Sequence, residues 1–316
     1  MSEPVPRTKA IRRAEAILRA ACGDRLRREF PLAPLTTFRI GGPAALYLEA
    51  EAEADLAAAA EAVCEADVPA VVIGKGSNVL VSDLGFQGLV LRLGRSYRWA
   101  ARDGERLTAG GAMPLAALSG VALSHSLSGL EFGVAIPGSF AGAVAMNAGA
   151  HGREIAEVIE WIDVFELRAG AMRRVPVAEV GFRYRGTNLA QGGVITGART
   201  KLEGADALEI RRRMDEAREW RRRTQPLAEP NCGSVFKNPP GEHAARLVDD
   251  AGGKGLTVGG ARVSTKHANF IVTEEGAHAV DVVRLIRAVQ ELVSDRFGIE
   301  LEPEVRLVGD FSVAPR

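Results

Sequence analysis

Cysteine is scarce in this sequence, and the few cysteines stand far apart. The 316 residues contain three of them, Cys22, Cys64 and Cys232, and no CxxC pair. An odd number without close spacing argues against a disulfide framework and against a zinc site, and it fits a reducing compartment. We therefore expect a cytoplasmic protein without a bound metal.

The sequence also lacks an excess of charge of one sign and any long apolar run. Its 40 lysines and arginines balance 40 aspartates and glutamates, whereas a general nucleic-acid binder normally shows a basic excess. No window reaches the roughly 18 apolar residues that a membrane span needs. The first residues carry charge throughout and lack the apolar core of a signal peptide. We expect no nucleic acid, no membrane and no obligate protein partner.

What the sequence does contain is helix and strand in alternation, in three blocks. The blocks cover residues 1–95, 96–205 and 206–316, and each mixes both patterns, which indicates an α+β or α/β protein. The expected helices are an amphipathic one carrying Ile11, Ala14, Ile17 and Leu18, then 53–66, one that starts at Pro114, 206–223 and 277–297. The expected strands are 44–50, 69–74, 79–81, 105–112, 158–167, 192–202 and 299–309.

The helix expected at 206–223 holds seven arginines. They alternate with acidic residues at i,i+4 spacing, as in Glu209/Arg213 and Glu219/Arg223. This pattern is typical of a solvated, ion-paired face. A phosphate-binding role for the last turn is the alternative.

The stretch "VVIGKGSNVLVSD" (71–83) contains Gly74-x-Gly76. A dinucleotide-binding fingerprint needs a third glycine and must open a helix, and here a strand follows instead. We therefore reject a Rossmann fold. Glycine, small residues and asparagine between two strands can instead turn their N–H groups inward as an anion-binding nest. An ordinary β-turn fits these residues equally well.

The stretch "GLEFGVAIPGSFAGAVAMNAGAHG" (129–152) is dominated by glycine and alanine. Each glycine inside a helix costs about 1 kcal/mol relative to alanine, so something must approach this backbone closely. Either a tightly packed helix pair or a large flat cofactor would explain it. Pro137 before Gly138-Ser139 also suits a helix start, where free N–H groups favour a phosphate.

Together these stretches resemble the UDP-N-acetylenolpyruvoylglucosamine reductase family, flavoenzymes that complete UDP-N-acetylmuramate for bacterial peptidoglycan. The resemblance runs over about residues 33–310. Besides the two stretches above it includes "TTFRIGG" (36–42), "FRYRGT" (182–187), "CGSVFKNP" (232–239), "AGGKG…GGARVSTKHANFIV" (251–272) and "LEPEVRLVG" (301–309). Several long motifs in the same order make the resemblance specific.

The resemblance implies an α+β fold in which two subdomains of the vanillyl-alcohol-oxidase-like type bind FAD. Residues 1–95 and 96–205 would form these subdomains, and 206–316 a C-terminal substrate-binding domain. NADPH and the second substrate would use one site in turn. The residues implied in FAD binding are Gly74, Lys75, Gly76, Ser77, Asn78, Ile136, Pro137, Gly138, Ser139, Gly142, Ala143, Asn147 and Gly149.

The implied reaction passes a hydride from NADPH to the flavin, and from flavin N5 to the β-carbon of UDP-N-acetylglucosamine enolpyruvate. Arg185 matches the family residue that binds the carboxylate, and a guanidinium suits a developing dianion. Glu304 matches the catalytic glutamate. Beside an enolate it is useful only when protonated, or when it positions the groups that carry the proton. Without the resemblance, both read as surface residues.

Ser234 would then donate the proton to the α-carbon. Cys232 is its rival, but a cysteine nucleophile needs a lowered pKa and a nearby base. None of the histidines lies near it in the sequence, so we interpret Cys232 as a packing residue. The implied substrate contacts are Tyr184, Lys237, Asn238 and His267, of which His267 can equally be a packed histidine.

The gap between "FRYRGT" and the strand at 193 is too short for the substrate-capping tyrosine loop of the family's longer type. The chain therefore resembles the shorter type. It departs from the family pattern in Thr187, where serine is usual, and in Thr36, where asparagine is common.

The resemblance places the protein in the cytoplasm and in peptidoglycan synthesis, and so in cell wall biogenesis, cell shape and cell division. Two other functions stay open at this point. Another FAD-dependent sugar or lactone oxidoreductase would use the same nest but not Arg185, Ser234 and Glu304 together. A catalytically silent nucleotide-sugar-binding protein would not need the residues of the active family at these three positions.

Overall fold

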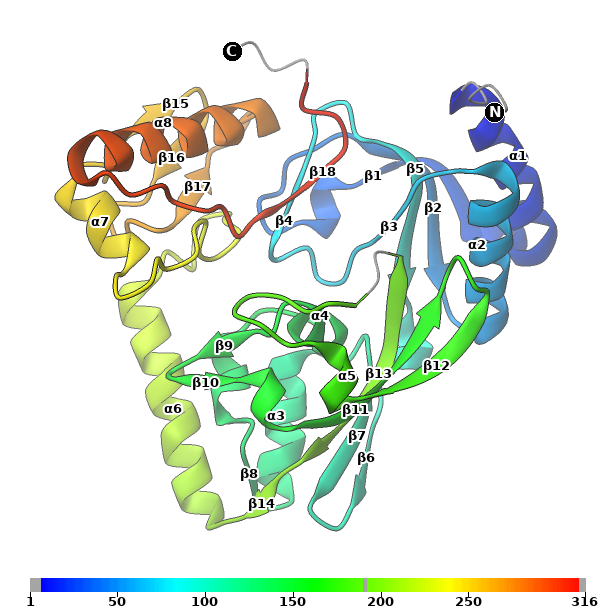
Figure 1. The fold of residues 1–316 in the computed structure, drawn as a ribbon, viewed down its shortest axis with the longest axis horizontal. Coiled ribbons are helices and arrows are strands. Elements are labelled where there is room, and N and C mark those ends of the chain that lie inside the picture. Colours follow the sequence, from blue (N-terminus) through cyan, green and yellow to red (C-terminus); the bar gives the residue numbers. More distant parts are fainter. Residues whose placement is uncertain (1–6, 190–191, 313–316) are drawn as a thin grey trace. The chain divides into compact units, whose positions relative to one another are not determined.

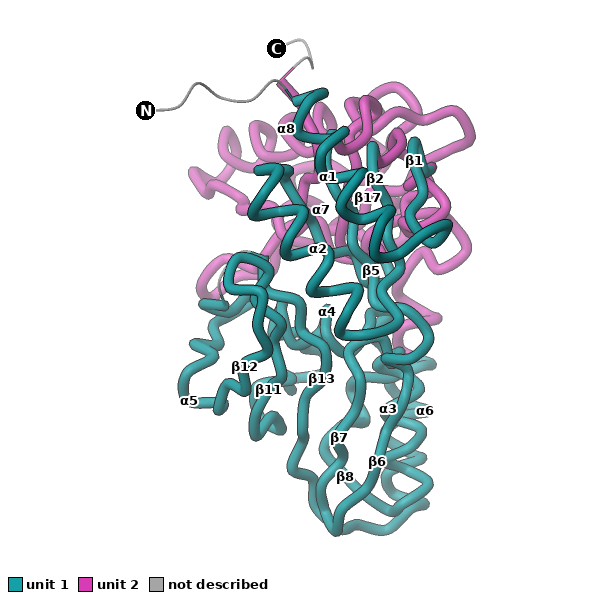
Figure 2. The backbone as a smooth tube through the Cα atoms, turned by 90° about the vertical axis from the view of Figure 1, so that its right-hand side faces the viewer, with its two compact units in different colours: residues 1–30, 45–75, 87–219 teal, residues 31–44, 76–86, 220–316 magenta. Residues whose placement is uncertain are grey.

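The computed structural model describes residues 7–189 and 192–312, and these form two compact units. The first unit takes in residues up to 30, then 45–75 and 87–219. The second takes in 31–44, 76–86 and the residues from 220 onward (Figure 2). The boundary expected near residue 95 falls inside the first unit. Residues 190 and 191, within the gap expected to lack the tyrosine loop, lie outside the described residues.

One half of the first unit is a four-stranded sheet with two helices. The strand order is β1-β2-β5-β3, with β3 and β5 parallel. In α1 the buried residues Ala10, Ala14, Leu18 and Cys22 form an i,i+4 stripe, which joins α2 and the sheet in one hydrophobic core. These elements are α1 (Arg7–Cys22), β1 (Leu26–Pro31), β2 (Pro43–Ala50), α2 (Glu53–Ala66), β3 (Ala70–Val72) and β5 (Phe86–Leu93).

A buried carboxylate secures the start of α2. The carboxylate of Asp55 accepts the N–H groups of Glu51 and Ala52, at 2.8 and 3.1 Å, and pairs with both terminal nitrogens of Arg25. Burial of the carboxyl raises its pKa, but hydrogen bonds from Arg25 and from the two backbone amides outweigh this, so the pKa of Asp55 is lowered.

The other half of the first unit is a five-stranded antiparallel sheet with the order β12-β11-β13-β7-β6. It shares a second hydrophobic core with α3 and α4. The elements are β6 (Ala100–Asp103), β7 (Arg106–Gly110), α3 (Leu115–Ser124), β8 (Leu127–Ser128), α4 (Phe140–Ala145), β9 (Gly149–Ala150), β10 (Arg153–Glu154), β11 (Ile159–Glu166), β12 (Ala171–Pro176), α5 (Val177–Val180), β13 (Gly193–Lys201) and β14 (Glu203–Gly204).

The second unit packs α8 across a three-stranded antiparallel sheet of β15, β16 and β17 (Figure 1). Its core combines this C-terminal part with Phe38 and Leu80 from the two early segments. β4 and β18 pair in parallel, with Leu80 opposite Leu307. The elements are β4 (Val79–Val81), α7 (Ala244–Asp250), β15 (Thr257–Val258), β16 (Ala261–Val263), β17 (Ile271–Thr273), α8 (Ala279–Phe297) and β18 (Arg306–Val308).

The strand expected over 299–309 is shorter than predicted and covers only β18. Pro303 has no N–H to give to a strand partner. Its neighbours bond to the loop after Ser234 instead: the N–H of Lys237 donates to the carbonyl of Glu302, and that of Glu304 to the carbonyl of Val235. The prediction was wrong here because a loop, and not a strand, takes up these backbone groups.

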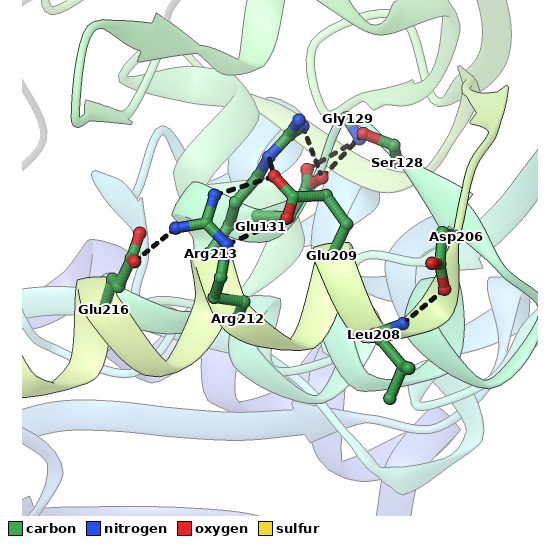
Figure 3. A network of polar contacts seen from close by, with 9 residues as sticks. All are labelled: Ser128, Gly129, Glu131, Asp206, Leu208, Glu209, Arg212, Arg213 and Glu216. Atoms are coloured by element: carbon green, nitrogen blue, oxygen red, sulfur yellow. Dashed lines mark hydrogen bonds and ion pairs between the residues drawn. The ribbon is translucent and has the colours of Figure 1, made fainter.

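The arginine-rich helix α6 (Ala207–Thr224) is ion-paired along its exposed face, as its pattern predicts (Figure 3). Glu209 accepts hydrogen bonds from Arg212 and Arg213, at 2.8 and 2.9 Å. These bonds lower the pKa of Glu209 to about 2. Arg213 also lies 3.6 Å from Glu131, which accepts the hydroxyl of Ser128 and the N–H of Gly129. The buried stripe of the helix is Ile210, Met214 and Ala217.

The described part of the chain has neither a membrane-spanning helix nor a metal-binding cluster. None of its helices is long and apolar enough to cross a membrane. No group of three or more histidine, cysteine, aspartate or glutamate side chains is arranged there to hold a metal ion.

Candidate active site

Within the first unit, the structure brings the start of the Gly74 stretch against the Gly/Ala-rich stretch. A Cβ on Gly74 would lie 2.5 Å from the hydroxyl oxygen of Ser139. Ser139 is also the N-cap of α4, where its oxygen accepts the N–H of Gly142 at 3.2 Å. The helix start expected near Pro137 therefore exists, three residues later, and Gly74 must be small to let this cap approach. The free N–H groups expected there for a phosphate are not found at Phe140 and Ala141, which donate to the carbonyls of Met113 and Gly111, at 2.7 and 3.0 Å.

The Gly/Ala-rich stretch contains a series of small, half-buried residues. They are Gly138, Ala141, Gly142, Ala145, Ala148, Gly149 and Ala150. Part of this composition serves packing within the protein, because a Cβ on Gly149 would lie 2.6 Å from the carbonyl oxygen of Arg153. At Gly142, in contrast, a Cβ would meet only the Ser139 hydroxyl, at 3.2 Å. Such a side-chain-poor surface fits a flat group such as a flavin.

In the second unit, the rest of the glycine-rich loop is fixed by the "TTFRIGG" segment. Gly76 has a left-handed φ of 61°, and a Cβ there would lie 2.1 Å from the carbonyl oxygen of Leu35. The N–H of Thr37 donates to the carbonyl of Gly76 at 3.1 Å. The side chain of Asn78 donates to the carbonyl of Glu304 at 3.1 Å. The loop expected to bind FAD is therefore bonded directly to the segment that carries the expected catalytic glutamate.

Arg185 occupies a strained position in a tight turn of the first unit. Arg183 and Gly186 exchange both backbone hydrogen bonds, at 3.0 and 3.1 Å, with Tyr184 and Arg185 between them. Arg185 has a φ of 55°, a left-handed conformation that usually calls for glycine at this place in a turn. Such strain costs about 1–3 kcal/mol and clusters at functional sites. The guanidinium lies 4.8 Å from the Tyr184 ring centre.

Ser234 and Glu304 are brought together in the second unit, although they are 70 positions apart in the chain. The N–H of Glu304 donates to the carbonyl of Val235, the residue after Ser234, at 2.7 Å. Ser234 is exposed and Glu304 half-buried. The sequence predicted the roles of these two residues only through the resemblance, and the structure now places them on neighbouring backbone.

Cys232 is buried and unreactive in character. Burial raises the pKa of its thiol, and the negative charge of Glu304 raises it further. Its side chain is 3% exposed and belongs to the hydrophobic core of the second unit. This environment is the opposite of what a thiolate nucleophile needs, and it agrees with the packing role predicted for Cys232.

Asn269 holds the Ser234 loop in place, a role that the sequence did not predict. Its side-chain oxygen accepts the N–H of Phe236 at 2.9 Å, and its amide nitrogen donates to the carbonyl of the same residue at 2.8 Å. Its own carbonyl accepts the N–H of Val235 at 2.9 Å. Asn269 is 4% exposed. It lies in "STKHANF", two residues after His267, and no local pattern in the sequence marks it as the residue that holds this loop.

The expected substrate contacts in the second unit have partners of their own. Lys237 pairs with Glu302 at 2.5 Å, and the side-chain oxygen of Asn238 accepts the N–H of Ala244 at the start of α7. His267 packs against Phe270, with ring centres 4.6 Å apart, and burial lowers its pKa. His267 thus has the character of a packed, neutral histidine, while its contact with substrate stays a prediction.

Thr36 and Thr187, the two residues that depart from the family pattern, both form hydrogen bonds through their hydroxyl groups. The buried Thr36 accepts the N–H of Arg39 and donates to the carbonyl of Ala33, both at 3.1 Å. Thr187 donates to the carbonyl of Ala145 at 3.4 Å.

A cavity of about 710 Å³ in the second unit lies apart from these residues. Phe38, Arg39 and Ile40 line it together with the residues before α8. The side chain of Asp83 accepts the N–H groups of Ala279 and Val280 there. No residue expected in the site is among those that line this cavity.

Comparison with known families divides the chain into two matched regions. Residues 44–175 match the profile described as an FAD binding domain. Residues 225–308 match that of the UDP-N-acetylenolpyruvoylglucosamine reductase C-terminal domain. The mixed helix and strand content, an FAD-binding part and a separate C-terminal part confirm the expected fold class.

Similar proteins cover nearly the whole chain. The UDP-N-acetylenolpyruvoylglucosamine reductase of Heliobacterium modesticaldum is 45% identical over 89% of this chain and 90% of its own length. That of an Anaeromyxobacter species is 46% identical over 90% and 89%. The crystal structure of the Thermus caldophilus enzyme superposes with a TM-score of 0.79 at 38% identity, covering 90% of this chain and 99% of that one. The chain belongs to the UDP-N-acetylenolpyruvoylglucosamine reductase family.

Proposed function

We propose that this protein reduces UDP-N-acetylglucosamine enolpyruvate to UDP-N-acetylmuramate in peptidoglycan precursor synthesis, with Arg185, Ser234 and Glu304 as its catalytic residues. It works in the cytoplasm and serves cell wall biogenesis, cell shape and cell division. FAD is the cofactor and NADPH the hydride donor. The observation that supports the assignment of Ser234 and Glu304 is the hydrogen bond between Glu304 and Val235, which joins their two distant motifs.

The residues present fit FAD. The Gly/Ala-rich stretch around Gly142 carries few side-chain atoms, and the Gly74 stretch meets the N-cap of α4. Residues 74–78 and 136–149 would hold the cofactor. When bound, FAD would supply hydride transfer from NADPH to the β-carbon of the enolpyruvyl group. The protein's task is then to bind the substrate, stabilise charge on its carboxylate and protonate its α-carbon.

Arg185 binds the substrate carboxylate. Addition of hydride to the β-carbon gives the α-carbon carbanion character, which spreads into the carboxylate as an enolate dianion. A guanidinium can bind both oxygens in a fork. A preorganised donor of this kind contributes about 3–4 kcal/mol of barrier lowering. The left-handed backbone at Arg185 supports this role, because strain of this kind clusters at functional sites.

Ser234 donates its proton to the α-carbon and regains one from solvent. The new C–H bond takes the electron pair of the enolate, so the sum of hydride and proton is the reduced ether. Glu304 lies beside this loop, where it stabilises the enolate as a protonated group or positions the proton for Ser234. Tyr184, Lys237, Asn238 and His267 are the proposed further contacts to substrate.

The proposal is tested first on the purified protein. We expect a yellow protein with bound FAD that NADPH bleaches without oxygen and that UDP-N-acetylglucosamine enolpyruvate reoxidises. A protein that binds no flavin would overturn the proposal and point to a silent nucleotide-sugar binder. A reduced protein that oxygen reoxidises at a competent rate, and the enolpyruvyl substrate does not, would instead identify a sugar or lactone oxidase.

The role of Ser234 is tested by Ser234→Ala in stopped-flow half-reactions. Loss of a general acid slows a reaction about 10²–10⁴-fold, so we expect reoxidation by the enolpyruvyl substrate to slow at least about a hundredfold, with flavin reduction by NADPH near normal. Ser124→Ala, at an exposed serine that ends α3, is the control and should change neither step. Equal loss in both half-reactions would count against proton donation by Ser234.

A further inference from the structure

The turn that carries Arg185 is supported by a polar network within the first unit. At its centre is Asn147, which is 2% exposed and has a left-handed φ of 42°. The side-chain oxygen of Asn147 accepts the N–H of Ala156 at 3.1 Å. Its amide nitrogen donates to the carboxylate of Glu154 at 2.7 Å and to the carbonyl of Arg183 at 3.1 Å. The orientation of the amide is unambiguous, because one partner is a donor and two are acceptors.

The Asn147 side chain therefore serves the protein and not a cofactor. The carbonyl of Arg183 accepts the N–H of Gly186, which closes the turn, and also the side-chain amide of Asn147. Asn147 therefore holds the turn at Arg183, two residues before Arg185. FAD contact at Asn147 was expected from the resemblance, and any such contact falls to its backbone. Leaving a buried polar group of this network unpaired would cost about 1–3 kcal/mol.

Glu154 connects Asn147 with Arg185. One of its carboxylate oxygens accepts the Asn147 amide, and the other lies 3.7 Å from a terminal nitrogen of the Arg185 guanidinium. The second terminal nitrogen of Arg185 donates to the carbonyl of Gly149 at 3.3 Å. Both side chains are partly shielded from water, at 20% exposure for Arg185 and 35% for Glu154. Glu154 thus has a fixed carboxylate beside the group that is proposed to bind substrate.

Gly149 makes room for this arrangement. It lies opposite Glu154 in the β9–β10 pair. A Cβ on Gly149 would lie 2.9 Å from the Cγ of Glu154 and 3.3 Å from a terminal nitrogen of Arg185. A side chain here would separate the two charged groups. The glycine is therefore explained by the Arg153 carbonyl at 2.6 Å together with the Glu154–Arg185 pair, independently of any cofactor.

We propose that Glu154 is a positioning residue for Arg185, held in place by Asn147, and that it orients the guanidinium toward the substrate carboxylate. The inference rests on the proposed function of Arg185. A separation of 3.7 Å is too long for a hydrogen bond, so the contact is an ion pair and orients the guanidinium without binding it tightly. A substrate carboxylate that forms two hydrogen bonds to the guanidinium fork binds more strongly, so the guanidinium turns to it when substrate arrives.

Glu154→Gln separates this role from a structural one. The glutamine oxygen can still accept the Asn147 amide, so the turn stays held, while the negative charge beside Arg185 is lost. A displacement of about 1 Å near reacting groups can cost about a hundredfold in rate. We expect kcat/KM for the enolpyruvyl substrate to fall about 10- to 100-fold, with slower reoxidation and unchanged flavin reduction by NADPH. Calorimetry with the oxidised protein should show about tenfold weaker substrate binding.

A double-mutant cycle with Arg185→Lys shows whether Glu154 acts through Arg185. In that background Glu154→Gln should change kcat/KM less than about threefold, because the oriented fork is already gone. The matched control is Glu166→Gln, which removes the partner of Arg173 at 2.8 Å in an ion pair between β11 and β12, where the carboxylate is about as exposed as that of Glu154. The control should match the wild type in both half-reactions and in substrate binding.

Several outcomes would overturn the inference. The first is a kcat/KM for Glu154→Gln within about twofold of the wild type. The second is an equal loss of rate in both half-reactions. The third is a double mutant with Arg185→Lys whose loss in kcat/KM equals the product of the two single losses. Should Glu154→Gln not fold, Glu154→Asp replaces it, since its shorter side chain draws the charge back from Arg185, and a loss below about threefold overturns the inference. A wild-type protein that does not reduce the enolpyruvyl substrate refutes the proposed function and this inference with it. The inference alone is refuted, and the proposed function stands, if the wild type turns over normally and Arg185→Lys slows the reaction while Glu154→Gln does not.

Discussion

Replacing Asn269 by alanine should damage both the stability of the second unit and the chemistry at Ser234. The substitution removes two buried hydrogen bonds, of 2.9 and 2.8 Å, and leaves the N–H and carbonyl of Phe236 without those partners. Phe236 is 2% exposed, so water cannot readily replace them. Each unsatisfied buried group costs about 1–3 kcal/mol, which gives a loss of about 2–6 kcal/mol in the free energy of unfolding.

The functional effect follows from where these bonds act. They fix the backbone two residues after Ser234, so without them the hydroxyl is no longer held at one place relative to the α-carbon of the substrate. We expect reoxidation by UDP-N-acetylglucosamine enolpyruvate to slow about 10- to 100-fold. Reduction by NADPH needs no proton from Ser234 and should stay within about threefold of the wild type. Urea unfolding measures the first effect, and stopped-flow flavin absorbance the second.

Thr273→Val is the control, because it removes one buried hydrogen bond in the same unit, from the Thr273 hydroxyl to the carbonyl of Phe38 at 2.9 Å. It should destabilise the protein without slowing reoxidation selectively. If Asn269→Ala unfolds within about 0.5 kcal/mol of the wild type, the hydrogen-bond argument is refuted. If it is destabilised and yet reoxidises normally, Asn269 does not position Ser234.

Two further predictions concern the titratable groups. The pKa of Asp55 is lowered in the folded state, so its ionised form stabilises the protein above the unfolded pKa of about 3.9, and this stabilisation is lost as pH falls through the folded value. The stability advantage of the wild type over Asp55→Asn should therefore shrink below about pH 4 in urea titrations; an advantage that is constant down to pH 2 would contradict this. With an alkylating reagent at pH 8, Cys64 should react in the folded protein, whereas Cys22 and Cys232, whose pKa values burial raises, should react only on unfolding. Mass spectrometry counts the modified thiols, and rapid alkylation of Cys232 with loss of activity would reopen its role as a nucleophile.

Local patterns predicted the regular elements well. The helix expected at 53–66 is α2 (Glu53–Ala66), and the strand expected at 44–50 is β2 (Pro43–Ala50). Periodic burial encodes such elements within a few residues of sequence. The assembly of the second unit could not be read in this way, because residues 31–44 and 76–86 join the C-terminal part through contacts that no local period records.

In the candidate site, too, the contiguous motifs could be predicted from the sequence and the long-range contacts could not. The motifs that carry Arg185, Ser234 and Glu304 could be found in the sequence, since each is a contiguous string of residues. The residues that hold them could not. Asn147 and Asn269 act through side-chain bonds to backbone groups 36 and 33 positions away. The left-handed backbone of Arg185 runs against the preference of its residue type, so only the structure reveals it.

The parallel pairing of β4 with β18 also means that the second unit cannot fold completely until the end of the chain has been synthesised. Beside it, the hydroxyl of Ser82 donates to the carbonyl of Asp310, across 228 positions of chain. At about 5–20 residues per second, roughly 10–45 s pass between the emergence of these partners from a ribosome. During that time the apolar side chains of Phe38 and Leu80 have no core to enter, because the second unit's core is built mostly from residues after 231. The early segments of the second unit, residues 31–44 and 76–86, therefore stay exposed until the end of the chain has been made.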